Sequence, residues 1–569
     1  MLPLSLLLAC TGTVDPTSDY ELTVVPVFLG NQGDGVLALE PDVKVRLARP
    51  GEDPEIVYLG QGGEGVELEA GSLPPVPADT VVGFIAEIPG GDPDVWNRAA
   101  TVAYGEATVT DDLATGHQKV ELRIPVLRID AVGRLGGLGD PDRQLGAAVA
   151  RLPDSGSVVM FGGADPSSTE TFVYEGITYA LQSSDAIVRV DPTEDGWGPP
   201  TRVGSLPPVW HGLTGDNDTQ GFVTGRNVGM VATTVTVEGR PMVLLTGGRY
   251  TYGFSPFNAS WWFLWDPETE DVAGGGLTEG TVRPDDDPPC VAAGSCGRLV
   301  QGRSEHALAR LGTRKVLVWG GLVGSGISNT PAWEIWSSGT MSSASGPYSS
   351  AVNAMPPLFG AVAEVDGGAV VCGGADYTED ASANHWVPVD TCLMVTSGEQ
   401  IQPLPSLPVP LAGAALAPLP GGGLLATGGT SETLDESKDQ QVRDVGPASA
   451  AAFRYTPSAG WRQVGDLVSA RAYHRALPLG DGRVLLVGGT STASTLYGNV
   501  NDPVRCTEIF DPETDRFTTS SCGDAGAGAW PAVEGDPVGG YAVLEGLDYL
   551  GGRLQGGNTY GIVGGAPLE

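Results

Sequence analysis

The chain has 569 residues, including 84 glycines and 45 prolines, and 41% of its residues are hydrophobic. This composition, with no apolar run of helical periodicity, predicts an all-β protein in which many short strands are joined by Gly/Pro turns. A formal net charge of −38 argues against nucleic-acid binding and against adsorption to anionic membranes, because both surfaces would repel the protein.

The first ten residues, MLPLSLLLAC, form an apolar run that is too short for a bilayer span of about 20 residues. The run is typical of a secretory signal. Its end, from Leu7 to Cys10, resembles the lipobox of bacterial lipoproteins, where the signal is cut before a cysteine that receives lipid. The resemblance implies export to the bacterial cell envelope or surface, with a lipid anchor at Cys10 and residues 1–19 as signal and tether. An ordinary secretory signal with an incidental cysteine is the alternative.

Residues 20–126 contain a series of short β-rich runs. Val43–Leu47, for example, alternates apolar and polar side chains, which is the pattern of a half-buried strand. Several such strands in a segment of this length predict a small antiparallel β-sandwich, immunoglobulin-like or prealbumin-like. We expect this module to act as a spacer between a membrane anchor and the rest of the chain.

From residue 127 onward, an apolar strand that ends in two glycines recurs. The stretch from Asp481 to Gly489 reads DGRVLLVGG, and a small-residue strand that begins RAYH at Arg471 precedes it. A second apolar strand follows and ends in a tight turn, as in EIFDPETDRF from Glu508. The copies end at Gly163, Gly248, Gly321, Gly374, Gly429 and Gly489, and a degenerate copy ends at Gly546.

Four antiparallel strands per copy predict the blades of a β-propeller. The paired glycines and the aromatic Asp-Pro turns resemble kelch repeats throughout residues 127–569. The resemblance implies a seven-bladed kelch-like β-propeller preceded by the β-sandwich. We expect the glycines to permit close backbone approach near the propeller axis. The last copy lacks a fourth strand, so we expect Leu127–Val132 to complete it and close the ring.

Six cysteines other than Cys10 fall into neighbouring pairs. An even number of cysteines in an exported chain predicts disulfides, with buried free thiols as the alternative. The last pair flanks a predicted hairpin, which would place the two cysteines opposite one another. The expected pairs are Cys290 with Cys296, Cys372 with Cys392, and Cys506 with Cys522.

The sequence contains no nucleophile elbow, P-loop or HExxH motif, and no CxxC or His-rich cluster. We therefore expect no catalytic residues, no metal and no cofactor. His306 and His474 occupy matching positions in two copies, and we interpret both as structural. The best-known enzymes on kelch-like propellers are galactose-oxidase-like copper enzymes. A galactose-oxidase-like or glycan-active enzyme is therefore the alternative function.

The connections between the second and third strands of the copies are long and carry aromatic residues. They share one face of a propeller, so we expect this loop face to bind a ligand. Aromatic rings beside carboxylates suit sugars or protein segments, although packing on the blades would also explain the rings. The sequence thus predicts a non-enzymatic binding scaffold for a protein or glycan. The candidate contacts are Tyr250, Tyr252, Phe254, Tyr377, Trp386 and Tyr497.

Overall fold

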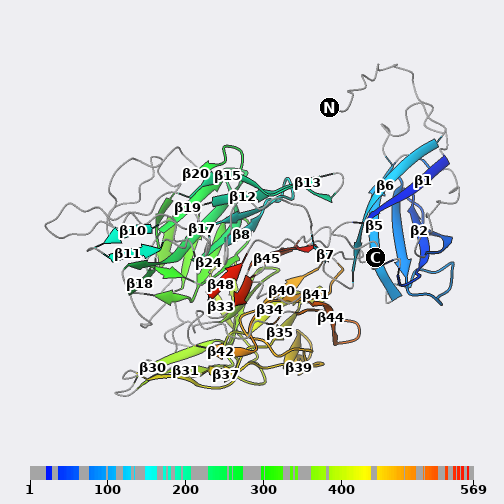
Figure 1. Ribbon diagram of the computed structural model, residues 1–569. Coiled ribbons are helices and arrows are strands. Elements are labelled where there is room, and N and C mark those ends of the chain that lie inside the picture. The colour runs from blue at the N-terminus through cyan, green and yellow to red at the C-terminus, as the bar shows by residue number, and fades with distance from the viewer. Residues whose placement is uncertain are drawn as a thin grey trace. The chain divides into compact units, whose positions relative to one another are not determined.

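The computed structural model divides the chain into two compact units, the first made mostly of Met1–Gly133 and the second of most of the remaining residues (Figure 1). Nearly all regular structure in the described residues is β-strand, which confirms the all-β prediction. Within the same residues, no helix is both long and apolar enough to cross a membrane. The structure describes residues 21–28, 36, 38–62, 76–77, 79–97, 100–109, 119–129, 133–134, 148–162, 171–174, 177–180, 186–193, 196–206, 228–252, 255–258, 261–272, 296–299, 302–304, 306–323, 333–337, 340–343, 360–379, 383–437, 445–479, 481–494, 504, 506–522, 532–535, 542–545, 547–550, 553–556 and 561–562.

The first unit contains one six-stranded sheet in the order β1-β6-β5-β4-β2-β3. Strands β1 and β6 pair in parallel, and the other neighbours pair antiparallel. No second sheet, which a sandwich would need, is found among the described residues of this unit. The strands are β1 (Glu21–Phe28), β2 (Asp42–Ala48), β3 (Glu55–Gln61), β4 (Val81–Glu87), β5 (Thr101–Thr108) and β6 (Lys119–Arg128).

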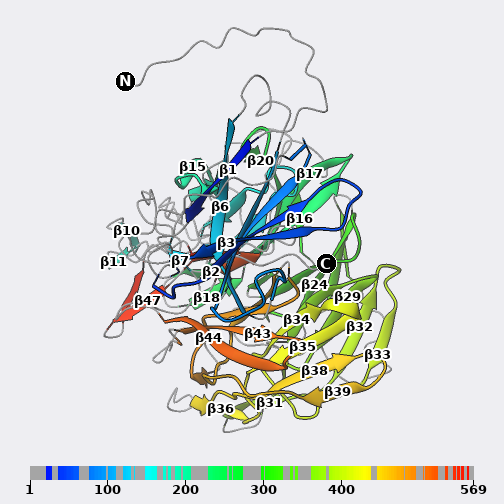
Figure 2. The ribbon, with the colours of Figure 1, turned by 90° about the vertical axis from the view of Figure 1, so that its right-hand side faces the viewer.

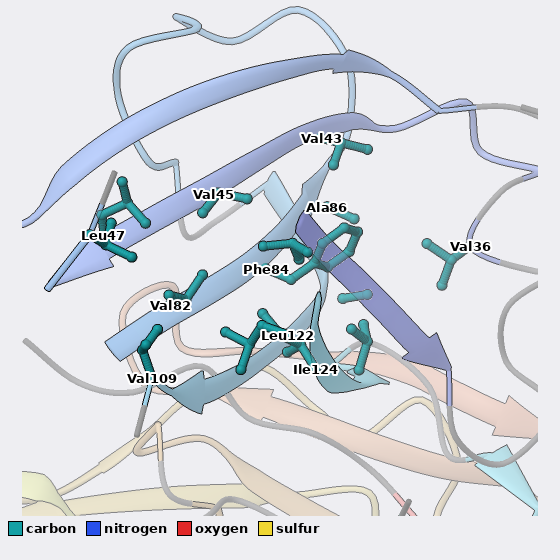
Figure 3. Packing of buried hydrophobic residues seen from close by; sticks show 14 of the residues in the cluster. Val36, Val43, Val45, Leu47, Val82, Phe84, Ala86, Val109, Leu122 and Ile124 are labelled. Atoms are coloured by element: carbon teal, nitrogen blue, oxygen red, sulfur yellow. The ribbon is translucent and has the colours of Figure 1, made fainter. Parts of the chain in front are cut away.

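The core of the first unit covers one face of this sheet (Figure 3). Val43, Val45 and Leu47 share that face with Phe84 and Ile124, as the alternating pattern of β2 predicts. Lys44 lies on the opposite face, yet it is buried because its Nζ pairs with Glu87 at 2.8 Å. The same Nζ donates to the carbonyl oxygens of Asp92 at 2.8 Å and Val95 at 2.6 Å, so the ion pair holds the β4–β5 connection on the sheet.

In the described residues, the second unit contains seven sheets with a core of four strands each. In six of them, the four strands pair in the order in which they follow one another along the chain, as expected for propeller blades. The first sheet contains β8 (Ala148–Arg151), β9 (Val158–Phe161), β12 (Ala186–Val190) and β15 (Thr201–Ser205). The second contains β16 (Val228–Val237), β17 (Arg240–Tyr252), β19 (Trp261–Asp266) and β20 (Asp271–Val272). The third contains β23 (Ala307–Arg310), β24 (Lys315–Trp319), β26 (Glu334–Ser337) and β27 (Thr340–Ser343).

The fourth sheet contains β28 (Ala361–Val365), β29 (Gly368–Cys372), β32 (Cys392–Thr396) and β33 (Ile401–Leu404). The fifth contains β34 (Ala415–Leu419), β35 (Gly423–Thr427), β38 (Ala452–Thr456) and β39 (Gly460–Gln463). The sixth contains β40 (Arg475–Pro478), β41 (Val484–Val487), β43 (Cys506–Asp511) and β44 (Arg516–Cys522). The seventh contains β45 (Ala532–Gly535), β46 (Ala542–Glu545), β49 (Gly561–Ile562) and β7 (Gly133–Arg134).

Shorter strands pair in several of the connections. Two of them extend the second sheet, and the others form small sheets of their own. The pairs are β10 (Thr171–Tyr174) with β11 (Ile177–Ala180), β13 (Pro192–Thr193) with β14 (Gly196–Trp197), β18 (Ser255–Asn258) with β17, β21 (Cys296–Arg298) with β19, β22 (Arg303–Ser304) with β25 (Leu322–Val323), and β47 (Leu547–Leu550) with β48 (Arg553–Gly556).

The first strand of each sheet contacts the first strand of the next. The contacts run from β8 through β16, β23, β28, β34 and β40 to β45, and β45 contacts β8. The short strands before the glycine pairs are buried along their whole length in β9, β29 and β41. The arrangement is therefore propeller-like, with continuous apolar strands packed between neighbouring sheets.

The strand that completes the seventh sheet lies later in the chain than the sequence predicted. Leu127 pairs with Tyr104 in the first unit, so this end of the expected Leu127–Val132 segment belongs to β6. Residues 130–132 lie outside the described residues. The fourth strand beside β49 is β7, which follows them. The closing segment was placed too early because the sequence does not show where the preceding strand ends.

The paired glycines join one sheet to the next. Gly428 has φ of +63°, and a Cβ on it would lie 2.2 Å from the carbonyl oxygen of Arg471, at the entry to the sixth sheet. The next amide, of Gly429, donates to that same oxygen at 2.8 Å. Gly373 and Gly374 repeat the geometry with Leu411 of the fifth sheet. Glycine is needed because the joint requires both a positive φ and space for a neighbouring carbonyl.

We expect Gly428→Ala to lower the free energy of unfolding by about 3 kcal/mol, because it adds backbone strain and a clash with a buried carbonyl. Gly460→Ala is the matched control. Gly460 has φ of +72° but no atom within 4 Å of an added Cβ, so only the strain of about 1 kcal/mol should appear. Urea denaturation of the two variants measures the free energy of unfolding. An equal decrease in both variants would contradict the proposed close contact at Gly428.

Candidate functional site

A second layer of β-structure lies over the fourth, fifth and sixth sheets and is built from their connections between second and third strands. β30 (Ala375–Glu379) and β31 (Ala383–Pro388) form a hairpin in the fourth sheet's connection, and β36 (Leu434–Ser437) from the fifth sheet's connection pairs with β31. β37 (Val445–Pro447) of the fifth pairs with β42 (Thr492–Ser494) of the sixth. We call these five strands the loop-face layer. They gather at one side of the second unit (Figure 1 and Figure 2).

A buried cluster anchors this layer to the sheets. Trp386 of β31 is 1% exposed and packs with Leu434, Ala412 and Ala472, with the half-buried Tyr473 beside them. These residues come from the connections and strand entries of three successive sheets. Trp386 was a candidate ligand contact, but its ring is covered, and its observed role is the packing that the sequence left as the alternative.

For the other candidate contacts, the structure describes either the backbone alone or no atoms. Tyr377 lies opposite Trp386 in the β30–β31 ladder. Tyr250 and Tyr252 lie at the end of β17, opposite Phe257 and Ser255 of β18, in the second sheet. The side chains of these three tyrosines lie outside the described residues. Phe254 and Tyr497 lie outside them altogether.

Asp376 is a polar group of the layer that the sequence did not single out. It lies opposite Val387 in the hairpin, and Val387 is 40% exposed. Burial raises the pKa of Asp376 above its usual value of 3.8. Its carboxylate has no hydrogen-bond or ion-pair partner among the described residues. Asp376 follows the Gly373–Gly374 pair, a position at which a loop-face side chain could have been expected from the repeat.

Tyr473 is a second residue that the sequence did not single out. Its backbone has φ of +59°, a conformation that is strained for a bulky side chain. Its amide donates to the carbonyl of Gly413 at 2.8 Å, and a Cβ on Gly413 would lie 2.6 Å from the Tyr473 ring. The ring of Tyr473 reaches the cluster below the layer because its own backbone adopts a strained φ and because Gly413 has no side chain in the way.

We expect Tyr473→Gly to be more stable than Tyr473→Ala by about 1 kcal/mol, because only glycine adopts the positive φ without strain. At Tyr455, which lies within β38, the order should reverse, since glycine weakens a regular strand. Urea denaturation of the four variants tests this inversion. Glycine being the less stable replacement at both positions would show that the strain at Tyr473 is absent.

A fully buried arginine lies just before the first strand of the third sheet and of the sixth sheet, and each is paired with a glutamate on the third strand of that sheet. Arg471 Nη2 lies 2.6 Å from Glu508 Oε1, and its Nη1 donates to the carbonyl of Gly488 at 3.1 Å. Arg303 pairs with Glu334 and donates to Gly320 at 2.9 Å in the same way. The arginines thereby bind the entry of the first strand to the second and third strands of the same sheet.

We expect Glu508→Leu to destabilise the protein by about 3–5 kcal/mol, because it leaves the buried charge of Arg471 without its partner. Glu508 also accepts hydrogen bonds from the amides of Val468 and Ser469, which the variant would leave unsatisfied. Glu513→Leu, at an exposed turn position, should change stability by less than about 0.5 kcal/mol. Thermal and urea unfolding measure both, and a small effect at Glu508 would overturn this role.

His306 and His474 connect neighbouring sheets, as expected of structural residues. His474 Nε2 lies 2.8 Å from Thr427 Oγ1 of the fifth sheet, and His306 Nε2 lies 2.6 Å from Thr246 Oγ1 of the second. Both imidazoles are almost completely buried. The sequence signal for these contacts is a histidine three residues after an arginine, together with a threonine before the preceding glycine pair.

The predicted disulfide between Cys372 and Cys392 is confirmed. It joins β29 to β32 where the β30–β31 hairpin leaves and returns, so it closes the base of that hairpin. Cys506 is also disulfide-bonded, and the backbone register places Cys522 opposite it. Cys290 lies outside the described residues, as does the side chain of Cys296.

Among the described residues, no group of three or more His, Cys, Asp or Glu side chains is arranged to hold a metal ion.

No family model matches the chain. No curated protein matches it. Among solved structures, it is similar to YjhT, with 12% identity, a TM-score of 0.39, and coverage of 68% of this chain and 99% of that one. It is also similar to a fungal alcohol oxidase of the AA5 family in complex with copper, with 11% identity, a TM-score of 0.46, and coverage of 77% and 76%. At these identities the likeness concerns the fold alone.

Proposed function

We propose that this chain is an exported, lipid-anchored, non-enzymatic binding protein, whose seven-bladed kelch-like propeller presents the loop-face layer to a protein segment or a glycan. The observation that carries the proposal is the joining of connections from three sheets into one layer. A propeller is closed by contacts between its blades and does not need a second layer for closure. Binding residues are found mostly on loops that a rigid scaffold holds in place, and this layer is built from such loops.

The blade count is supported by the cycle of contacts from β8 through β45 and back to β8. The kelch assignment is supported by the paired glycines, which are part of the kelch-like pattern. At Gly373–Gly374 and at Gly428–Gly429 they make the same contact with the backbone carbonyl before the next sheet. Closure of the ring would leave only the short, protected edge strands of the individual sheets, which lowers the risk that a large β-protein aggregates.

The layer is suited to binding because its backbone is restrained before any ligand arrives. The Cys372–Cys392 disulfide closes the base of the β30–β31 hairpin, and Trp386 anchors β31 to the cluster below. A preorganised surface loses less conformational entropy on binding than a mobile loop does. Asp376 and the exposed Val387 offer a hydrogen-bond acceptor and apolar area side by side.

The proposed location rests on two observations of different kinds. Disulfides persist in oxidising compartments, so Cys372–Cys392 supports export. The run that ends at Cys10 supports a lipid anchor, with residues 20–126 as a spacer whose sandwich fold remains part of the proposal.

The test is binding of the full-length chain to a glycan array and to an array of surface-protein peptides. In one variant, a Gly-Asn-Gly turn replaces residues 376–387, which removes the hairpin above the disulfide. We expect its apparent affinity for the bound probe to fall at least tenfold, because the presented surface is gone, while Glu513→Ala leaves affinity unchanged. Full binding by the shortened variant would overturn the proposed face. Oxidation of alcohols after copper reconstitution would favour the enzyme alternative.

A further inference from the structure

We propose that the contact between the fifth and sixth sheets is an acid-sensitive seam, which opens when His474 takes up a proton and thereby loosens the loop-face layer. The inference rests on the proposed function only in assigning this regulation to the layer that binds the ligand. A second copy of the same device, around His306, lies between the second and third sheets.

The His474 seam holds the imidazole in a buried site that disfavours its protonated form. Its Nε2 bonds to Thr427 Oγ1 across the seam at 2.8 Å. Its Cε1 packs so closely on Gly428 that an added Cβ there would lie 2.7 Å away. Its Nδ1 is buried and has no hydrogen-bond partner in the described part of the chain. Both ring nitrogens of a protonated histidine are donors, so the charged form has a buried Nδ1–H group for which the described residues provide no acceptor.

The charges around His474 oppose protonation. Its own segment supplies Arg471 and Arg475, both positive. The carboxylate of Glu508, on β43, is already engaged by Arg471 and by two backbone amides. Among the described residues, the fifth sheet contributes the uncharged Thr427 and Gly428 to the imidazole contact. Burial, with the charges of Arg471 and Arg475, holds the pKa of His474 well below its usual value of 6.5.

The direction of the pH effect follows from this depressed pKa. Once the seam opens, His474 regains its usual pKa, so the open state takes up a proton below about pH 6.5 and the closed state does not. The closed seam is thus fully favoured above pH 6.5 and is lost progressively as the pH falls. The ratio of open to closed states should rise about tenfold per pH unit for one histidine.

The same arrangement occurs around His306, so the chain contains this device twice. His306 Nε2 bonds to Thr246 Oγ1 at 2.6 Å, its Nδ1 has no partner among the described residues, and its Cε1 packs on Gly247. Burial and Arg303 hold the pKa of His306 well below 6.5. Glu334, the only carboxylate nearby among these contacts, is paired with Arg303.

The seam between the fourth and fifth sheets has the same backbone joint without a titratable group. Its entry residues are Leu411 and Ala414, where the sixth sheet has Arg471 and His474, and Cys372 stands where Thr427 does. Gly374 donates to the Leu411 carbonyl at 2.7 Å, as Gly429 does to Arg471 at 2.8 Å. The chain therefore contains an internal control with matched geometry.

The loop-face layer crosses the His474 seam. β37 belongs to the fifth sheet's connection and β42 to the sixth's, and they pair from Val445–Ser494 to Pro447–Thr492. The amide of Ala448 also donates to the carbonyl of Ser491 at 3.0 Å. Separation of the two sheets would break these bonds, so protonation of one buried histidine is transmitted to the proposed binding face.

One other titratable group on this seam titrates outside the relevant range. Burial raises the pKa of Asp515, but its hydrogen bonds and ion pairs with Arg462 and Arg454 of the fifth sheet outweigh this and leave the pKa below 3.8. Asp515 therefore stays ionised between pH 7.5 and 5. Asp376, whose raised pKa would make acid stabilising rather than destabilising, lies on the fourth sheet's hairpin.

The experiment is hydrogen–deuterium exchange of the full-length protein between pH 7.5 and 5.0, corrected for the intrinsic pH dependence of exchange. We expect protection of the Gly429 and Arg471 amides to fall about tenfold per pH unit below 6.5. Protection of Gly374 and Leu411, the matched amides of the control seam, should stay constant. Equal loss at both seams, or loss at neither, would overturn the proposal.

His474→Gln is the decisive variant, because a glutamine amide can still form a hydrogen bond with Thr427 but does not titrate in this range. It should abolish the pH dependence at Gly429 and Arg471, and persistence of that dependence would refute the role of His474. Because hydrogen exchange is measured without a ligand, the acid-sensitive seam and the proposed function are tested independently of one another. Ligand binding without seam opening would refute only this inference, and seam opening in a protein that binds no array probe would refute only the function.

Discussion

The second unit depends on one repeated contact, in which the carbonyl just before the first strand of one sheet meets the glycine pair at the end of the second strand of the preceding sheet. At Gly428 and Gly429 this carbonyl belongs to Arg471, and at Gly373 and Gly374 it belongs to Leu411. The hydrogen bond satisfies a backbone acceptor that would otherwise be buried without a donor. Neighbouring sheets are therefore held together by backbone hydrogen bonds as well as by packed side chains.

Charged side chains connect the sheets again at the turns between third and fourth strands. Arg189 of the first sheet reaches Glu270 of the second, Lys315 of the third reaches Glu399 of the fourth, and Arg454 of the fifth reaches Asp515 of the sixth. Each acidic partner has a positive φ, which directs it toward the neighbour. Such half-exposed pairs contribute at most about 1 kcal/mol each. We expect these ion pairs mainly to align neighbouring sheets with one another. In this acidic chain, they place the few basic residues at the contacts between sheets.

The loop-face layer and the seams below it form one mechanical system. Trp386 packs over residues of three sheets, and the β37–β42 pair spans the contact that contains His474. Any change that separates the fifth and sixth sheets must therefore reach the surface proposed to bind a ligand. This coupling follows from connectivity, because the layer is made of the same connections that the seams hold in place.

The all-β class, the recurring sheets and the Cys372–Cys392 pair could be predicted from the sequence, because each follows from a local pattern of apolar runs, turn residues and cysteine spacing. Tertiary structure alone decided that Trp386 is buried and that Lys44 is sheltered by Glu87, since both outcomes depend on partners far along the chain. It also decided that β7 completes the seventh sheet and that Tyr473 accepts a strained backbone beside Gly413. A local pattern specifies which residues form a strand, whereas burial and strain depend on which other segments the fold brings against it.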